Sequence, residues 1–217
     1  MILIAAATPF EIKNIIDFVN QNPLYEDIIF SITGIGIAAT AYSLTKAINN
    51  KKPDIIIQAG IAGAFNHDLK IGDVVLVKSE TWSDLGIEDN NRYLTLFETN
   101  LLGINTPPYR HGEIPFTGIN GFDHLKRVKA ITSNTAHGND NTINNIIEKF
   151  NPEIETMEGA AAAYVCASEN IPFIQIRAIS NYVEKRDKSK WNIPLAISRL
   201  NEEIITYLTS ARRNILS

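Results

Sequence analysis

The sequence predicts a single α/β domain, spanning residues 1–217, with a central mixed, mainly parallel twisted sheet flanked by helices. Strand-like and helix-like runs alternate along the chain, which is typical of parallel strands joined by helices. The run at 172–180 is apolar on both faces, as expected for a buried central strand. A chain of 217 residues with 45% apolar content is long enough to bury one substantial core.

The first part of the chain predicts four strands and two helices. A strand at 2–7 leads to a helix from Pro9 to Val19, because proline is favoured in the first helical turn. A second strand at 27–33 passes through a glycine-containing turn into the next helix. The remaining elements are a helix at 38–49 and strands at 54–60 and 73–80.

The later part begins with an irregular stretch at 82–118, rich in Gly, Pro, Asn and aromatic residues, which predicts a long functional loop. The final helix is amphipathic, since apolar residues from Ile193 to Ile215 recur at spacings of three and four. The pattern also predicts strands at 127–133 and 172–180 and helices at 140–150 and 159–170.

The composition argues against several classes of protein. A net charge of -4 with scattered cations predicts no nucleic-acid partner. No run approaches the roughly 20 apolar residues of a membrane span, and the apolar start of the chain is typical of a strand rather than of a signal peptide. A lone cysteine, Cys166, argues against a disulfide scaffold and for a reducing compartment, so we expect a cytoplasmic protein.

Neither a metal nor a cofactor is expected. The four histidines lack the close spacing of metal ligands, and there is no serine nucleophile elbow and no Walker loop. The stretch "GIGIAA" (34–39) matches a dinucleotide fingerprint weakly, because the next strand does not end in the acid that would hold a ribose. A tight turn or a close approach of backbone to another ligand are the alternatives.

Three charged residues are candidates for chemistry. Glu11 follows the first strand, where open α/β sheets bind ligands, although an acid in the first turn of a helix is also favourable by itself. Glu158 begins a helix whose dipole should keep its carboxylate ionised. Arg177 lies in an apolar strand and needs a carboxylate partner such as Glu11 or Glu158, either for structure or for a site.

The chain resembles the nucleoside phosphorylase and nucleosidase superfamily over nearly its whole length, and most closely the nucleosidases that cleave methylthioadenosine and adenosylhomocysteine. The resemblance implies a nucleoside phosphorylase-like fold, a small-molecule nucleoside substrate and a homo-oligomer whose partner chain closes the pocket at the 5′ end. The segments that carry it are "AAATPFEI", "TGIGIAAT", "PDIIIQAGIAGAF", "IGDVVLV", "ETMEGAAAAYVC" and "RAISN".

The resemblance also implies roles for individual residues. Glu11 would activate the attacking water, Met157 and Glu158 would hold the ribose, and Arg177 would contact the water. Independently, carboxylates near the sugar suit the positive charge that develops there when an N-glycosidic bond breaks. Further substrate-binding residues are expected in the glycine-rich turn and near the base: Gly60, Ile61, Ala62, Gly63 and His137, the last as a stacking residue. Ile61 departs from the family, which usually has a water-contacting serine there.

Asn181 falls where the adenine-cleaving relatives carry an aspartate. An ionised carboxylate would repel the two acceptors of a 6-oxopurine, N7 and the carbonyl oxygen, whereas a carboxamide NH2 offers two donors. The motifs "ETMEGAA", "RAISNYVEKR" and "PLAI" resemble the futalosine hydrolases, which release hypoxanthine in a menaquinone biosynthesis route. The alternative is an asparagine that merely ends a strand.

Other functions stay open. An adenine-releasing methylthioadenosine or adenosylhomocysteine nucleosidase is the first alternative. A phosphorylase is disfavoured, because Gln58 stands where phosphorylases place a phosphate-binding arginine. A silent nucleoside-binding protein is disfavoured by Glu11 and Glu158. The carboxylated aromatic group of futalosine would need a cation and an apolar wall, with candidates Arg110, His111, Lys185, Arg186, Trp82, Tyr93 and Phe97.

Overall fold

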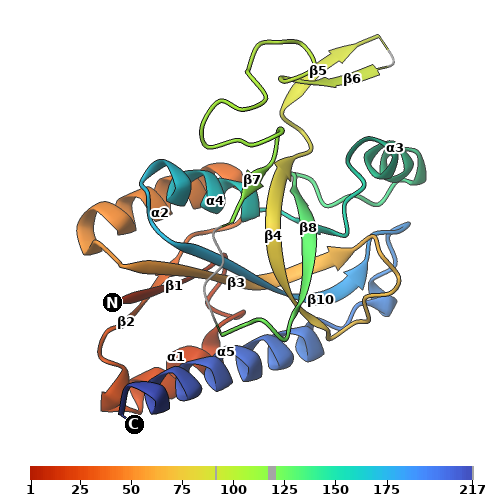
Figure 1. Ribbon diagram of the computed structural model, residues 1–217. Helices are drawn as coiled ribbons and strands as arrows, with labels where there is room; N and C mark the ends of the chain where they lie inside the picture. Colours follow the sequence, from red (N-terminus) through yellow and green to blue (C-terminus); the bar gives the residue numbers. More distant parts are fainter. Residues whose placement is uncertain (91, 117–120, 217) are drawn as a thin grey trace.

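The computed structural model describes residues 1–90, 92–116 and 121–216, and it places eight of the strands in one mixed sheet with helices on both sides (Figure 1). This arrangement confirms the predicted fold class. The strands of this sheet are β1 Ile2–Ala6, β2 Ile28–Ile32, β3 Ile55–Ala64, β4 Val74–Trp82, β7 Ile114–Pro115, β8 Lys126–Thr132, β9 Ile154–Thr156 and β10 Phe173–Tyr182.

Most strand pairings are parallel. The strand order is β10-β4-β8-β9-β3-β1-β2, with β7 beside β4, and β10 also pairs along β3. Strands β3, β10, β4, β8 and β9 therefore close into a ring, while β1 and β2 extend the sheet from the first half of β3. The inward residues of the ring form one apolar cluster that includes Val75, Val128 and Ile179.

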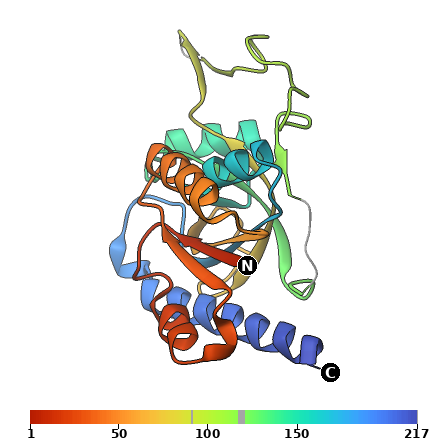
Figure 2. The same ribbon diagram turned by 90° about the vertical axis from the view of Figure 1, so that its left-hand side faces the viewer.

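Helices cover the two faces of the sheet (Figure 2). Their bounds are α1 Lys13–Asn20, α2 Ile37–Lys51, α3 Asp140–Phe150, α4 Gly159–Ser168 and α5 Ile193–Leu216, with short 3-10 helices at Pro23–Tyr25 and Lys188–Lys190. Alternation along β1 divides its side chains: Leu3 and Ala5 pack in the cluster of α2 and α4, whereas Ile4 and Ala6 pack in that of α1 and α5.

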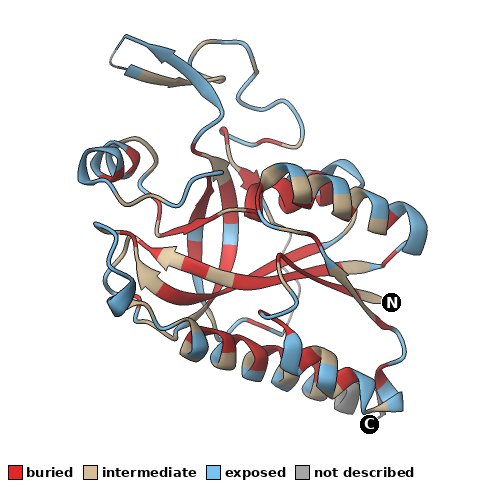
Figure 3. Ribbon diagram, turned by 180° about the vertical axis from the view of Figure 1, so that it is seen from behind, coloured by how far each residue is buried: buried red, intermediate tan, exposed pale blue. Residues whose placement is uncertain are grey.

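Two of the helices agree closely with the sequence pattern. Helix α3 has the predicted bounds, because the Asn139 side chain caps it by accepting from the N–H groups of residues 141 and 142. Helix α5 buries one face against the sheet and exposes the other (Figure 3). Its buried apolar residues include Ile197, Leu200, Ile204 and Leu208. The side chain of Ile215 lies outside the described part of the chain.

The structure corrects three predicted boundaries. Helix α1 begins at Lys13 instead of Pro9, because the preceding turn is closed by Thr8, which binds the carboxylate of Glu11. Strand β3 continues through the glycine-rich stretch at 60–63, which is therefore not a turn. Strand β10 likewise continues to Tyr182, so Asn181 lies within the strand and does not end it.

The predicted irregular stretch at 82–118 contains more structure than its composition suggests. It holds a hairpin of β5 Gly86–Asp89 and β6 Arg92–Thr95, which projects beyond the end of β4 (Figure 1), as well as β7. Residues 91, 117 and 118 of this stretch lie outside the described residues. Strand β9 was also absent from the prediction, because three residues are too few for a pattern to emerge.

Candidate active site

A cavity of about 370 Å³ gathers most of the predicted site residues. It opens where β1, β3 and β10 end and where α4 begins, which is where ligands bind in sheets of this kind. The predicted residues among those lining it are Glu11, Ile61, Ala62, Gly63, His137, Met157, Glu158 and Asn181. Gly60 and Arg177 are not among the lining residues and lie directly behind the cavity wall formed by Glu11 and Glu158.

Glu11 is held in the turn between β1 and α1 by three donors. The backbone N–H and the hydroxyl of Thr8 donate to Oε2 at 2.9 and 3.0 Å, and the N–H of Ile61 lies 3.3 Å from Oε1. Because Glu11 precedes the helix, a favourable charge in the first helical turn does not explain it. A carboxylate fixed in this way, and facing a cavity, can take a proton from a water molecule.

Glu158 is the N-cap residue of α4 but does not cap the helix with its side chain. Thr156 Oγ1 and Thr132 Oγ1 instead accept from the N–H groups of Gly159 and Ala160, at 3.2 and 2.8 Å. The Glu158 carboxylate is therefore free to face the cavity. There it accepts from the N–H of Gly36 at 3.1 Å.

Opposing effects act on the pKa of the Glu158 carboxyl. Burial raises the pKa of the Glu158 carboxyl and the nearby Glu11 charge adds to this, while the Arg177 charge and the Gly36 N–H lower it. The net shift is upward. The glycine motif at 34–39 also contributes to the site. Gly36, with φ of +89°, directs its backbone N–H to the Glu158 carboxylate.

Arg177 is 1% exposed and pairs with one of the two carboxylates. Its Nη1 lies 3.7 Å from Glu158 Oε2, so the predicted carboxylate partner is Glu158. A Cβ on Gly60 would lie 2.2 Å from this Nη1 and 3.1 Å from Glu11 Oε1, so any side chain at this position would press against both groups. Among the described residues, Arg177 Nε and Nη2 are buried and have no hydrogen-bond partner, and Arg177 does not line the cavity.

A second buried acid, Glu80, supports this arrangement from behind. It accepts from Thr132 Oγ1 at 2.9 Å, from Thr156 Oγ1 at 3.2 Å and from Gln175 Nε2 at 2.8 Å. The two threonines are the ones that cap α4, so Glu80 holds the start of the helix that carries Glu158. Burial raises the pKa of Glu80 to about 7, against the lowering effects of Gln175, the Arg177 charge and the threonines.

Replacing Glu80 with glutamine should change how stability depends on pH. The native protein holds the Glu80 proton more tightly than the unfolded chain does, so this group lowers the free energy of unfolding as the pH rises from about 4.5 to about 7, by about 3 kcal/mol in total. In Glu80→Gln this loss should be absent. Urea unfolding of both proteins at pH 5 and 7.5 measures the difference, and equal pH dependence would contradict it.

Asn181 lies at one end of the cavity with its carboxamide orientation determined by its neighbours. Ser180 Oγ donates to Oδ1 at 2.8 Å, and Nδ2 donates to the carbonyl of Tyr182 at 2.9 Å. Turning the amide over would place Oδ1 against that carbonyl oxygen. The second N–H of Nδ2 is left for a ligand, so the site offers one donor from Asn181 instead of the two expected from the sequence.

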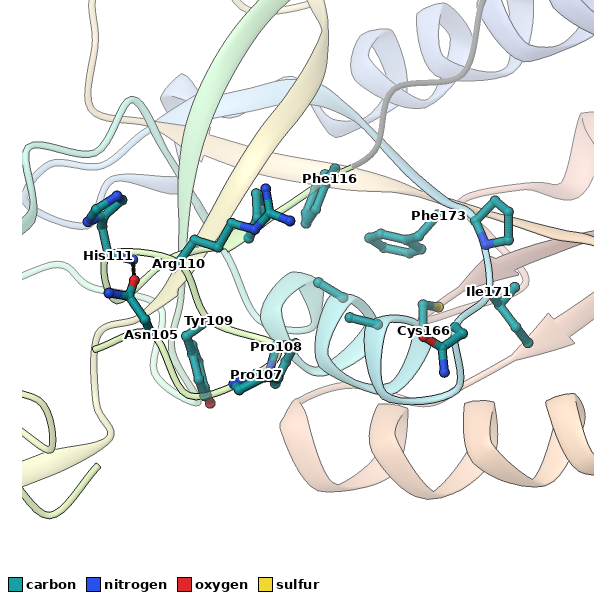
Figure 4. Close-up of a pocket in the computed structure, with 15 residues that line it drawn as sticks. Asn105, Pro107, Pro108, Tyr109, Arg110, His111, Phe116, Cys166, Ile171 and Phe173 are labelled. Carbon is teal, nitrogen blue, oxygen red and sulfur yellow. Dashed lines mark hydrogen bonds between the residues drawn. The ribbon is translucent and has the colours of Figure 1, made fainter. Parts of the chain in front are cut away.

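The candidate residues for a carboxylated 5′ group are divided between two places. Trp82 donates from Nε1 to the Tyr109 hydroxyl at 3.0 Å and packs in the core under α4. Arg110 and His111 line a separate hollow of about 820 Å³, between the loop before β7 and the end of α4, which none of the predicted site residues line (Figure 4). Only Arg186 lines the site cavity, with its guanidinium 5.2 Å from the centre of the Trp191 ring.

Several residues that support or line the site were not singled out from the sequence, in addition to Thr132 and Thr156. Thr8 positions Glu11, Glu80 supports α4, Trp191 lines the cavity and Glu155 binds His137. Only Thr8 had a local signal, since it stands three residues before an acid. Within the described residues, no helix is long and apolar enough to cross a membrane, and no group of three His, Cys, Asp or Glu side chains is placed to bind a metal ion.

The sequence is similar to a known family along most of its length. The profile of the Phosphorylase superfamily matches residues 2–209. The 5′-methylthioadenosine/S-adenosylhomocysteine nucleosidase of Buchnera aphidicola is 29% identical over 180 residues, which cover 78% of this chain and 74% of that protein. The futalosine hydrolase of Streptomyces coelicolor is 28% identical over 183 residues, which cover 79% of this chain and 74% of that protein.

Solved structures share the fold at lower sequence identity. The Neisseria meningitidis 5′-methylthioadenosine/S-adenosylhomocysteine nucleosidase, in complex with methylthio-immucillin-A, superposes with a TM-score of 0.81 at 17% identity, covering 96% of this chain and 98% of that one. The futalosine hydrolase of Helicobacter pylori superposes with a TM-score of 0.79 at 16% identity, covering 96% and 97%. Both superpositions extend over almost the entire sheet and its helices.

Proposed function

The chain belongs to the Phosphorylase superfamily and is an N-glycosidase related to its nucleosidases, and we propose that it hydrolyses futalosine to hypoxanthine and dehypoxanthine futalosine. The observation that carries the choice of substrate is the Asn181 carboxamide. Its oxygen is occupied by Ser180, so the group that it presents to a base is an N–H donor. A donor suits the acceptors on the N7 edge of a 6-oxopurine.

In the proposed reaction, two carboxylates work at the sugar. Glu11, fixed by Thr8, takes a proton from a water molecule in the cavity, while the Arg177 charge supports Glu158 from behind the cavity wall. Glu158 accepts from ribose hydroxyls and stabilises the positive charge that grows as the bond from C1′ to N9 breaks. Met157 lies beside it against the sugar.

Two features favour hydrolysis of a nucleoside with an anionic 5′ group. Gln58 is buried in β3 and is neutral, so it does not supply the charge that an arginine gives to a phosphate site. Arg186, in contact with the Trp191 ring at the cavity, offers a cation and an apolar surface to a carboxylated aromatic group. We expect the enzyme to act in the cytoplasm, as one domain within a homo-oligomer.

The second candidate is a methylthioadenosine or adenosylhomocysteine nucleosidase, which the names of several relatives favour. The test is to incubate the purified protein with futalosine and with methylthioadenosine, in phosphate-free buffer, and to identify the released base by chromatography. Hypoxanthine from futalosine alone supports the proposal. Adenine from methylthioadenosine alone would assign the second candidate, and a requirement for added phosphate would indicate a phosphorylase.

Asn181→Asp should lower kcat/KM for futalosine by about 100-fold. A carboxylate there would face both the Tyr182 carbonyl and the acceptors of the base, and an unmade or repulsive polar contact costs a few kcal/mol. Asn181→Ala is the matched control, because it removes the donor without adding a negative charge, and it should lose less activity. If Asn181→Asp cleaves futalosine at the wild-type rate, the carboxamide does not select the base.

A further inference from the structure

A histidine and a glutamate form a tight pair at the cavity. The backbone N–H of His137 donates to Glu155 Oε1 at 3.0 Å, and the ring Nδ1 donates to Glu155 Oε2. A carboxylate can only accept, so Nδ1 must carry a hydrogen and the imidazole is held in one orientation. The side chains are 12% and 7% exposed. Within the described residues, Nε2 makes no hydrogen bond or ion pair, and His137 lines the cavity.

The sheet places this pair opposite Asn181. In the pairing of β3 with β9, Gly63 is the partner of Glu155, and in the pairing of β3 with β10 it is the partner of Asn181. Adjacent strands lie about 4.8 Å apart, so the backbones of Glu155 and Asn181 are about 10 Å apart across the glycine. Partner residues point to the same face of a sheet, and all three line the cavity.

Gly63 leaves the space between them open. A Cβ on this residue would lie 3.2 Å from Asn181 Nδ2 and 2.9 Å from a methyl carbon of Val183. Any side chain would therefore press against the carboxamide. The result is a slot with a bare glycine floor, the Asn181 donor at one side and the His137–Glu155 pair at the other, which suits a flat ring such as a purine.

The pair supplies a chemical group that Asn181 lacks. An amide does not act as a general acid, yet a purine leaves an N-glycosidic bond more readily when one of its ring nitrogens is protonated. Of the other titratable groups at the cavity, Glu11 and Glu158 lie beside Arg177, and Glu184 is paired with Lys190 at 2.7 Å. Tyr182 stacks on the His67 ring at 4.5 Å. Among the described residues at the cavity, His137 offers an imidazole nitrogen, Nε2, that makes no hydrogen bond to the protein.

We propose that His137, oriented by Glu155, is the general acid that protonates the departing purine. As the bond from C1′ to N9 breaks, its electron pair moves into the purine ring, and the proton on Nε2 of the imidazolium passes to a ring nitrogen. Water adds to C1′ and gives its proton to Glu11. Transfer of that proton to solvent and uptake of another by His137 restore the enzyme. The inference rests on the proposed nucleosidase function but not on which purine leaves.

The decisive variant is His137→Phe, which keeps an aromatic ring for stacking and removes the acid. For whichever nucleoside the wild-type protein cleaves, kcat should fall about 100-fold to 10,000-fold, the range for loss of a general acid, while KM changes little. Glu155→Gln should lower kcat by about 10-fold or more, because the His137 ring loses the carboxylate that holds it in its orientation. Thermal melting of both variants shows whether they are folded.

A matched control is available on the surface. His124 also contacts a glutamate, Glu203, at 2.8 Å, but neither residue lines the cavity. His124→Phe should leave kcat and KM unchanged. A folded His137→Phe protein with wild-type kcat would overturn the inference and leave His137 a stacking residue. If the wild-type protein cleaves neither futalosine nor methylthioadenosine, the proposed function fails and the inference fails with it.

Discussion

Glu158→Gln should reduce kcat/KM for the nucleoside by about 1,000-fold, the scale for removing a preorganised group that stabilises transition-state charge. The carboxylate faces the cavity only because Thr132 and Thr156 cap α4 in its place. An amide can accept fewer hydrogen bonds from the ribose hydroxyls and carries no charge against the positive sugar. The substitution also leaves Arg177 buried with no ionised partner at 3.7 Å.

Steady-state kinetics of Glu158→Gln and of Glu169→Gln measure this effect. Glu169 follows α4 at its opposite end and is exposed, so its replacement should leave turnover unchanged. Because Arg177 loses its ion pair in the first variant, its melting temperature must be compared with that of the wild-type protein. Near-normal turnover by folded Glu158→Gln would show that this carboxylate does not hold the ribose.

Glu11→Gln should lower kcat by about 100-fold to 10,000-fold, as expected for removal of a general base. The amide can still accept from Thr8 through its oxygen, but its nitrogen cannot take a proton from water. The contacts that hold sugar and base do not involve this side chain. The dissociation constant of the uncleaved nucleoside should therefore stay within a few-fold of the wild-type value.

Single-turnover rates and direct binding of the nucleoside to Glu11→Gln separate the two effects. Glu26→Gln is a suitable control, because Glu26 is an exposed glutamate in the same part of the chain and does not line the cavity. A Glu11→Gln protein that turns over within a few-fold of the wild-type rate would remove Glu11 from the role of base. Loss of binding instead of catalysis would make it a substrate-holding residue.

The local sequence pattern was sufficient to predict an element where the segment is long and its burial is regular along its length. Helix α3 has its predicted bounds, since Asn139 supplies the cap within the segment itself. Helix α5 and the apolar strand β10 were also recognised, because the spacing of their apolar residues matches the side chains that the structure buries. The end of a strand depends on its partner strand, which the local pattern does not contain. Strand β10 extends past Asn181 because β3 continues to pair with it.

The candidate site was predicted unevenly for a related reason. Residues with an unusual chemistry for their surroundings, such as Arg177 in an apolar strand, were recognised from the sequence. Their supporting partners were not, because Glu80, Thr132 and Glu155 look ordinary in their own segments and acquire their roles only through contacts with distant strands.

The sequence by itself determined the alternating α/β order, the family resemblance and the types of side chain that a nucleosidase requires. Only the tertiary structure decided that one N–H of Asn181 is already engaged, that Arg177 pairs with Glu158 over Gly60, and that His137 and Glu155 face Asn181 across Gly63. The apolar periodicity that predicts helices and strands reflects contacts between residues that are close in the sequence. The chemistry of a site depends on distances between strands that lie far apart in the sequence, and the packing of the sheet sets those distances.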